Sequence, residues 1–129
     1  MIGMNNPLNV RFNPLNHWRG LTGSTRGFCD FSKEYYGVRA AMYLLFRSYK
    51  KKNCVTYAHM IARYAPSVEN NTNEYIAFIC NRMHVYPWDI PQHLNEWIDL
   101  FYYMSIYEGN VIAKDTIEKY FYEFLGESK

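Results

Sequence analysis

The sequence is poor in the residues that cross-link small proteins or bind metal ions. It has three cysteines, Cys29, Cys54 and Cys80, an odd number without the short spacing of a metal site. Its four histidines are scattered along the chain. There is also no glycine-rich phosphate loop and no Gly-x-Ser-x-Gly elbow. We therefore expect free thiols, no metal site and no cofactor.

Long apolar runs and a marked excess of one charge are also lacking. No stretch reaches the roughly 20 apolar residues of a transmembrane helix, and the N-terminus lacks the basic and apolar regions of an export signal. The sequence thus predicts a soluble protein without a membrane span, made in a cytoplasm. The net charge is +2, and the one basic cluster, Arg47 with Lys50-Lys51-Lys52, suits the negative end of a helix. We expect no nucleic-acid partner.

Aromatic residues are abundant instead, at 19% of the 129 residues. A chain of this length buries roughly two thirds of its unfolded surface, which suffices for one domain spanning residues 1–129. Thirteen of the aromatic residues are tyrosines. A tyrosine packs its ring in a core and turns its hydroxyl to water or a polar ligand, so core packing and a sugar-binding surface are both open interpretations.

Apolar periodicity predicts a mainly α fold of about five helices. They follow an irregular N-terminal region with at most a small β-hairpin between Val10 and Phe31. The expected N-caps are Ser32 for a helix reaching Lys52, Thr56 for a helix ending at Tyr64, and Asn71 or Thr72 for a helix reaching Met83. We expect no repeats or internal linkers.

The two C-terminal helices have their own boundary signals. Pro91 suits the first turn of a long, strongly apolar helix, which is expected to be the central buried one. That helix should end at Glu108, because Gly109 favours the left-handed conformation that reverses the chain. A final helix is expected to begin at Asp115, with Glu118 completing a variant of the capping box.

Several short segments occur in a fixed order along the first half of the chain. They are Asn5-Asn6-Pro7-Leu8-Asn9-Val10-Arg11, Trp18-Arg19-Gly20, Gly27-Phe28-Cys29-Asp30-Phe31, Tyr36-Gly37-Val38-Arg39-Ala40 and Ala65-Pro66-Ser67-Val68-Glu69-Asn70-Asn71-Thr72-Asn73-Glu74-Tyr75-Ile76. The ordered set resembles a family of small phage virion structural proteins. It also resembles the part of lysozyme-like glucosaminidases and lytic transglycosylases that follows their catalytic residue. The resemblance runs from Asn5 to about Ile79 and returns near Glu108.

This resemblance implies a lysozyme-like domain that cleaves peptidoglycan as a muramidase or lytic transglycosylase. It implies a protein made in the cytoplasm of a bacterial host, associated with the virion and acting at the cell wall. Its partners would be peptidoglycan glycan strands and other virion proteins. In the enzymes the catalytic Glu precedes the Asn-Pro segment, whereas here Glu108 lies near the C-terminus. A circular permutation would explain this order and predicts that residues 5–11 pack beside the end of the long helix.

Glu108 is the candidate catalytic acid. Cleavage of a glycosidic bond needs a carboxyl group that stays protonated near neutral pH, and an apolar setting at a negative helix end favours that form. By the resemblance, Tyr75 would orient the substrate or the acid, although Asn71 stands where the transglycosylase motif has Glu. We also expect Asn9, Arg11 and Glu69 to bind substrate.

Each of these residues has a plainer alternative. Glu108 is alternatively a solvated residue at a helix end, and Tyr75 is alternatively a core residue. Asn9 is alternatively a residue that forms hydrogen bonds to the backbone of its own loop. The available second carboxylates are Asp30, Glu34 and Glu69, and none has a spacing that converts into a distance. Single-acid chemistry assisted by the substrate's N-acetyl group therefore suits the resemblance better. The alternative functions are a non-catalytic virion structural or adaptor protein that keeps the fold, and a small helical adaptor without sugar binding.

Overall fold

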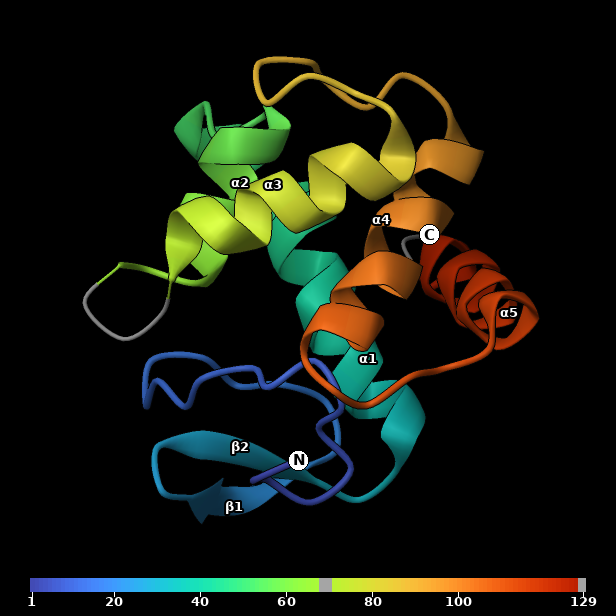
Figure 1. The fold of residues 1–129 in the computed structure, drawn as a ribbon. Helices are drawn as coiled ribbons and strands as arrows, with labels where there is room; N and C mark the ends of the chain where they lie inside the picture. Colours follow the sequence, from blue (N-terminus) through green and yellow to red (C-terminus); the bar gives the residue numbers. More distant parts are fainter. Residues whose placement is uncertain (68–70, 128–129) are drawn as a thin grey trace.

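The computed structural model describes residues 1–67 and 71–127, and within them the protein is mainly α. The described residues form five α-helices and one small sheet (Figure 1). The helices are α1 (Glu34–Tyr43), α2 (Tyr57–Tyr64), α3 (Thr72–Met83), α4 (Leu94–Tyr107) and α5 (Lys114–Gly126). The sheet is the antiparallel hairpin β1 (Leu21–Thr25) and β2 (Phe28–Phe31), which lies within the region where a hairpin was expected.

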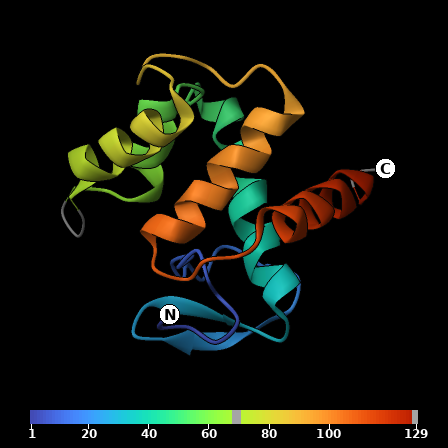
Figure 2. The ribbon, with the colours of Figure 1, turned by 45° about the vertical axis from the view of Figure 1, so that its right-hand side comes forward.

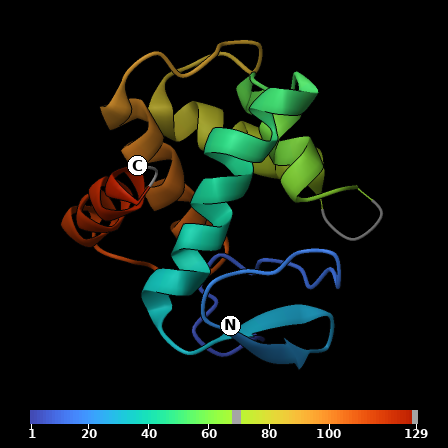
Figure 3. The ribbon, with the colours of Figure 1, turned by 180° about the vertical axis from the view of Figure 1, so that it is seen from behind.

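Helices α1 and α4 cross in the middle of the molecule, so the long helix that was expected to be the central one shares that place with α1 (Figure 2). α1 starts beside the hairpin and leads towards α2, as the view from behind shows most clearly (Figure 3). α4 crosses in front of α1 and packs against α3 on one side and α5 on the other (Figure 2). The core between these helices is rich in fully buried aromatic rings, namely Phe31, Tyr57, Tyr75, Phe101, Phe121 and Phe124. Tyrosines thus pack in the core.

The N-terminal segment is irregular but firmly held by one buried side chain. The Asn6 amide donates to the carbonyl oxygens of Val10 and Cys29 at 2.9 Å each, and its own oxygen accepts from the Val10 N–H at 2.8 Å. Asn6 is completely buried, and all of its side-chain polar atoms are thereby satisfied. This side chain ties residues 6–10 to strand β2, so the segment can present neighbouring side chains at fixed positions.

The predicted helix boundaries at Thr56, Asn71 and Gly109 are confirmed. The Thr56 hydroxyl accepts from the His59 N–H at 3.1 Å, and the Asn71 side chain accepts from the Glu74 N–H at 3.2 Å. Gly109 has a φ of +82°, a left-handed conformation that glycine adopts without strain. Thr56 and Asn71 thus cap the N-termini of α2 and α3, and Gly109 follows the C-terminus of α4, as the local signals indicated.

Three other boundary predictions are wrong, because contacts that those predictions did not include decide where each helix begins. Ser32 does not cap α1, because its N–H donates to the Gly20 carbonyl, which holds Ser32 at the end of the hairpin and leaves Lys33 as the residue before the helix. α4 starts at Leu94 rather than at Pro91, because the Glu96 carboxylate accepts from the His93 N–H at 3.0 Å. α5 starts at Lys114, whose ammonium pairs with Asp99 of α4 at 3.0 Å, and no side chain caps it.

The first helix also changes geometry along its length. The α-helical hydrogen bonding ends at Tyr43, and the chain continues as a π-helical turn, Leu44–Ser48, and a 3-10 turn, Lys50–Lys52. Asn53 then ends the helix with a φ of +57°. The expected helical span up to Lys52 is thus confirmed, but as three consecutive geometries rather than one.

All three cysteines are free thiols, as the odd count predicts. Burial raises the pKa of Cys29 to about 11 and raises that of Cys80 as well, so neither thiol ionises readily. Within the described ranges, no helix combines the length and apolar character needed to cross a lipid bilayer.

Candidate functional site

Glu108 immediately follows α4, the helix whose buried face includes Phe101, Met104 and Ser105. Its N–H still donates to the Met104 carbonyl at 2.9 Å, so the helical hydrogen bonding holds its backbone. Gly109 then reverses the chain, and the Asn110 N–H returns to the Ser105 carbonyl at 3.0 Å. The half-buried Glu108 side chain is therefore fixed at the negative end of the helix dipole.

The N-terminal segment packs against this helix end. The Asn9 side-chain amide donates to Glu108 Oε1 at 2.8 Å, across 99 positions of sequence. A second link runs from the Asn110 side chain to the Pro7 carbonyl at 3.0 Å. The predicted packing of residues 5–11 beside the end of the long helix is confirmed. Asn9 itself has a φ of +54°, which asparagine tolerates better than other non-glycine residues.

Tyr75 contacts the other oxygen of the same carboxylate. Its hydroxyl donates to Glu108 Oε2 at 2.9 Å, and its ring stacks on Tyr107 with 4.0 Å between the ring centroids. Only 1% of Tyr75 is exposed. The two interpretations of Tyr75 are therefore compatible, since a core ring carries a hydroxyl that orients the candidate acid.

A hollow of about 150 Å³ lies beside this carboxylate. It is lined by Ile2, Asn9, Arg11, Phe28, Tyr64, Ala65 and Glu108. The Arg11 guanidinium lies 4.8 Å from the centroid of the Phe28 ring, so Arg11 borders the hollow beside Glu108. Glu108 is the one carboxylate in this lining of described residues.

The other acidic candidates do not join Glu108. Asp30 accepts from the Thr25 hydroxyl and from the Met4 N–H, and Glu34 accepts from the Tyr120 hydroxyl. Glu69, predicted to bind substrate, lies outside the described residues. The structure thus brings together Glu108, Tyr75, Asn9 and Arg11 of the predicted site residues.

No protein-family model matches this chain, and no curated protein matches it. Across residues 1–67 and 71–127, no group of His, Cys, Asp and Glu side chains is arranged to hold a metal ion.

Burial dominates the electrostatics of Glu108. It raises the pKa of the carboxyl group above its ordinary value, although the hydrogen bonds from Asn9 and Tyr75 and the charge of Arg11 act in the opposite direction. Burial and the Glu108 charge in turn raise the pKa of Tyr75, so its hydroxyl keeps its proton and remains a donor. A carboxyl group with a raised pKa has the property that a general acid needs.

Three residues build the site in ways that the sequence did not predict, although Tyr107 was expected to lie beside Glu108. Asn6 shapes the segment that carries Asn9, and the Tyr64 hydroxyl donates to the Leu8 carbonyl at 2.6 Å, which fixes the same segment against α2. Tyr107 supports the Tyr75 ring. Tyr64 and Tyr107 had only the signature of helix-face tyrosines, so nothing in their spacing distinguished them from ordinary core residues.

The raised pKa of Glu108 predicts a specific dependence of stability on pH. Because the folded state holds this proton more tightly than the unfolded chain, ionisation of Glu108 destabilises the fold. Relative to Glu108→Gln, the wild-type protein should therefore lose stability as the pH rises from the ordinary value of 4.5 through the raised pKa. The expected loss is about 1.4 kcal/mol for each pKa unit by which folded and unfolded chains differ.

Urea unfolding at a series of pH values measures this difference. Below the ordinary pKa the two proteins should have nearly equal free energies of unfolding, and at neutral pH the Glu108→Gln variant should be the more stable. Glu118→Gln, at an exposed position of α5, is the matched control. A loss of stability of Glu108→Gln relative to wild type, as the pH rises from acidic to neutral, would contradict the assignment of a raised pKa.

Proposed function

We propose that this protein is a peptidoglycan-cleaving glycosidase of the muramidase or lytic transglycosylase type, in which Glu108 is the catalytic acid. The observation that carries the proposal is the Glu108 carboxyl group itself. It is buried enough to have a raised pKa, is oriented by Asn9 at 2.8 Å and Tyr75 at 2.9 Å, and borders a hollow. This arrangement is suited to protonating a glycosidic oxygen.

Proton transfer from Glu108 to the glycosidic oxygen would break the bond between that oxygen and the anomeric carbon. A second carboxylate is not part of the hollow's described lining, so the substrate's own N-acetyl oxygen would stabilise the anomeric carbon. Either water or the sugar's 6-hydroxyl then completes the reaction. Attack by water gives a reducing end, whereas attack by the hydroxyl gives an anhydro sugar.

Asn9 supplies a second observation in favour of an N-acetylated substrate. Its Nδ2 group donates to Glu108, but its buried Oδ1 has no hydrogen-bond partner within the described part of the chain. A buried acceptor without a partner is costly, and buried polar atoms are nearly always satisfied. The N–H of a substrate acetamido group would donate a hydrogen bond to this Asn9 oxygen. Arg11, beside it, would pair with a carboxylate of the glycan-peptide polymer.

The test is digestion of purified peptidoglycan by the wild-type protein, followed by mass spectrometry of the released fragments. We expect cleavage between sugars, with one class of end dominant. Anhydro ends would identify a lytic transglycosylase, and reducible ends would identify a hydrolase. Absence of any cleavage of the wall of the natural host would overturn the catalytic proposal.

The second candidate is a non-catalytic virion structural or adaptor protein that retains the fold. Two observations favour it. The hollow at Glu108 measures about 150 Å³, below the roughly 300 Å³ at which small-molecule sites begin. An apolar hollow of about 450 Å³ lies instead near the start of α4. In the connection that precedes α4, the rings of Tyr86 and Trp88 stack on each other, and these residues are 63% and 69% exposed. Exposed aromatic groups of this kind are typical of protein contacts.

Both candidates place the protein in a virion. In the catalytic case the glycan strands are its substrate and the virion carries it from the host cytoplasm to the cell wall. In the structural case its partners are other virion proteins. Mass spectrometry of purified particles tests the location that the two candidates share, whereas the digestion of peptidoglycan separates them.

A further inference from the structure

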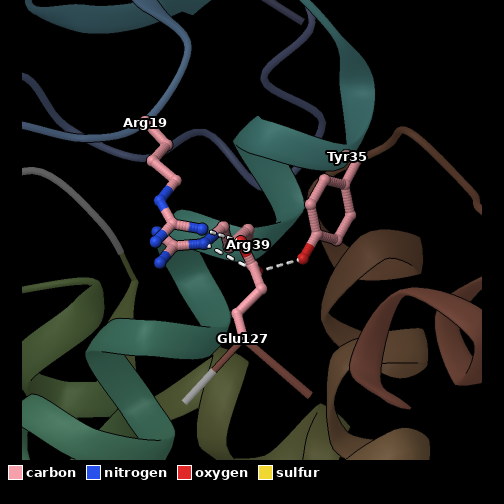
Figure 4. Close-up of polar contacts among 4 residues, drawn as sticks. All are labelled: Arg19, Tyr35, Arg39 and Glu127. Carbon is pink, nitrogen blue, oxygen red and sulfur yellow. Dashed lines mark hydrogen bonds and ion pairs between the residues drawn. The ribbon is translucent and has the colours of Figure 1, made fainter. Parts of the chain in front are cut away.

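Glu127, which directly follows α5, joins the end of that helix to α1 through a polar cluster (Figure 4). Glu127 Oε2 accepts from Arg39 Nε at 3.0 Å and from the Tyr35 hydroxyl, and Oε1 accepts from Arg19 Nη1. In Figure 4 the two guanidinium groups lie on one side of the carboxylate and the Tyr35 hydroxyl lies on the other. Although burial raises the pKa of Glu127, these hydrogen bonds and charges lower it overall, so the carboxylate is ionised.

A hollow of about 280 Å³ opens beside this cluster. It is lined by Arg19, Arg39, Tyr43, Arg47, Phe124 and Glu127. The Arg47 guanidinium lies over the Phe124 ring, 4.8 Å from its centroid, and that of Arg39 lies 5.8 Å from the centroid of Tyr43. Three guanidinium groups and one carboxylate therefore line one space with an aromatic wall, which leaves two positive charges uncompensated within the lining.

The hydrogen bonds to Glu127 account for the presence of Arg19 and Arg39 in this hollow, but they do not account for Arg47. Among the described residues, Arg47 has cation–π contacts with Phe46 and Phe124 but no ion pair with a carboxylate. Arg39 and Arg19 each use one nitrogen on Glu127, whereas a guanidinium group has five N–H donors. The guanidinium groups that line the hollow thus have many more N–H donors than the single Glu127 carboxylate can accept from.

An adjoining hollow of about 310 Å³ continues this surface. It shares Arg19, Arg39 and Tyr43 with the first and adds His17 and Trp18 among its lining. The buried Trp18 Nε1–H, which only donates, has no hydrogen-bond partner in the described part of the chain. Trp18 thus adds one unsatisfied donor to the residues that line this second hollow.

We propose that the hollow lined by Arg19, Arg39 and Arg47 is a binding site for a small oxyanion, either a carboxylate or a phosphate group. Guanidinium groups bind both anions through paired, charge-assisted hydrogen bonds. Arg47 is the main contact, and the nitrogens of Arg39 and Arg19 that do not bind Glu127 complete the site. The site is separate from Glu108 and does not depend on whether Glu108 is catalytic.

NMR titration of the full chain tests this site, first with inorganic phosphate and separately with acetate, at constant ionic strength. We expect saturable shifts at Arg47, Arg39 and Tyr43. Arg47→Gln should raise the dissociation constant about tenfold or more, because it removes charge-assisted hydrogen bonds to the anion. An unchanged thermal midpoint would show that the variant is folded.

Arg82→Gln is the matched control, because the Arg82 guanidinium lies 4.7 Å from the centroid of the Phe78 ring but does not line this hollow. It should leave the dissociation constant unchanged. Glu127→Gln should tighten binding several-fold, since it removes the carboxylate that competes with the ligand for Arg19 and Arg39. Saturation by phosphate alone or acetate alone identifies which anion the site takes.

Three results would overturn the proposal. The first is a shift that grows without saturation, which is the behaviour of weak screening at a charged surface. The second is binding that Arg47→Gln does not weaken. The third is a response centred on Lys50–Lys52, which would assign the anion to the exposed lysine run instead.

Discussion

Glu108→Gln is expected to abolish cleavage of purified peptidoglycan while the protein stays folded. Glutamine has the size of glutamate and can keep hydrogen bonds to Asn9 and Tyr75, but it cannot deliver a proton to the leaving oxygen. General acid catalysis contributes about a hundredfold to ten-thousandfold to a rate, so the loss should bring cleavage below detection or close to it. Release of soluble fragments from purified wall, followed over time, measures the effect.

Two other variants make this result interpretable. Tyr75→Phe removes one hydroxyl that lies 2.9 Å from Glu108 Oε2 and should weaken cleavage less, by about the 1 kcal/mol of a single hydrogen bond. It should also move the decline of activity at alkaline pH to higher pH, because the lost hydrogen bond stabilises the ionised carboxylate. Glu118→Gln, an exposed acid on α5, should be fully active. Cleavage that persists in Glu108→Gln would mean that another acid, such as Glu69, Glu34 or Asp30, is responsible.

The helices could be predicted from sequence where a boundary depends on nearby residues. Thr56 and Asn71 bond to the backbone three positions ahead, and Gly109 needs only its own backbone freedom. The start of α4 also depends on a nearby residue, because the Glu96 carboxylate accepts from the His93 N–H three positions back, and the prediction from Pro91 overlooked this capping contact. Ser32 misled because its N–H donates to the Gly20 carbonyl, which holds Ser32 in the hairpin region. A single local signal therefore fails where another contact decides the boundary, whether that contact is near in sequence, as for Glu96, or distant, as for Gly20.

The candidate site could be predicted only in part, for the same reason. Asn9 and Glu108 are 99 positions apart, and no periodicity or spacing connects them. Their proximity was expected only because the order of segments resembles a rearranged lysozyme-like domain. Tyr64 and Asn6 were not predicted, because both act by holding the backbone of residues 6–10 in place. Tyr64 donates to the Leu8 carbonyl, and Asn6 donates to the carbonyls of Val10 and Cys29. Such contacts carry no sequence signature.

Gly37→Ala is expected to destabilise the protein severely, although alanine is the better helix former. Gly37 lies in α1 where the N-terminal segment crosses it, and a Cβ atom at this position would lie 2.1 Å from the Asn5 carbonyl oxygen and 3.2 Å from Asn6 Cα. Both neighbours are backbone atoms, so no side-chain rotation relieves the clash. Overpacking costs about 1–3 kcal/mol in cores where side chains can adjust, and we expect the upper end or more here.

Gly126→Ala provides the matched control, because Gly126 is also helical and a Cβ atom there would meet nothing within 4 Å. It should be neutral or stabilising by up to about 1 kcal/mol, the difference in helix propensity. Urea unfolding of the two variants should therefore move the midpoint in opposite directions or move it for Gly37→Ala alone. In the Gly37 variant the displaced Asn5 and Asn6 should also loosen Asn9 from Glu108, so any glycosidase activity should fall with stability. Equal stability of the two variants would show that the N-terminal segment does not lie against α1, and the geometry proposed for Glu108 would fall with it.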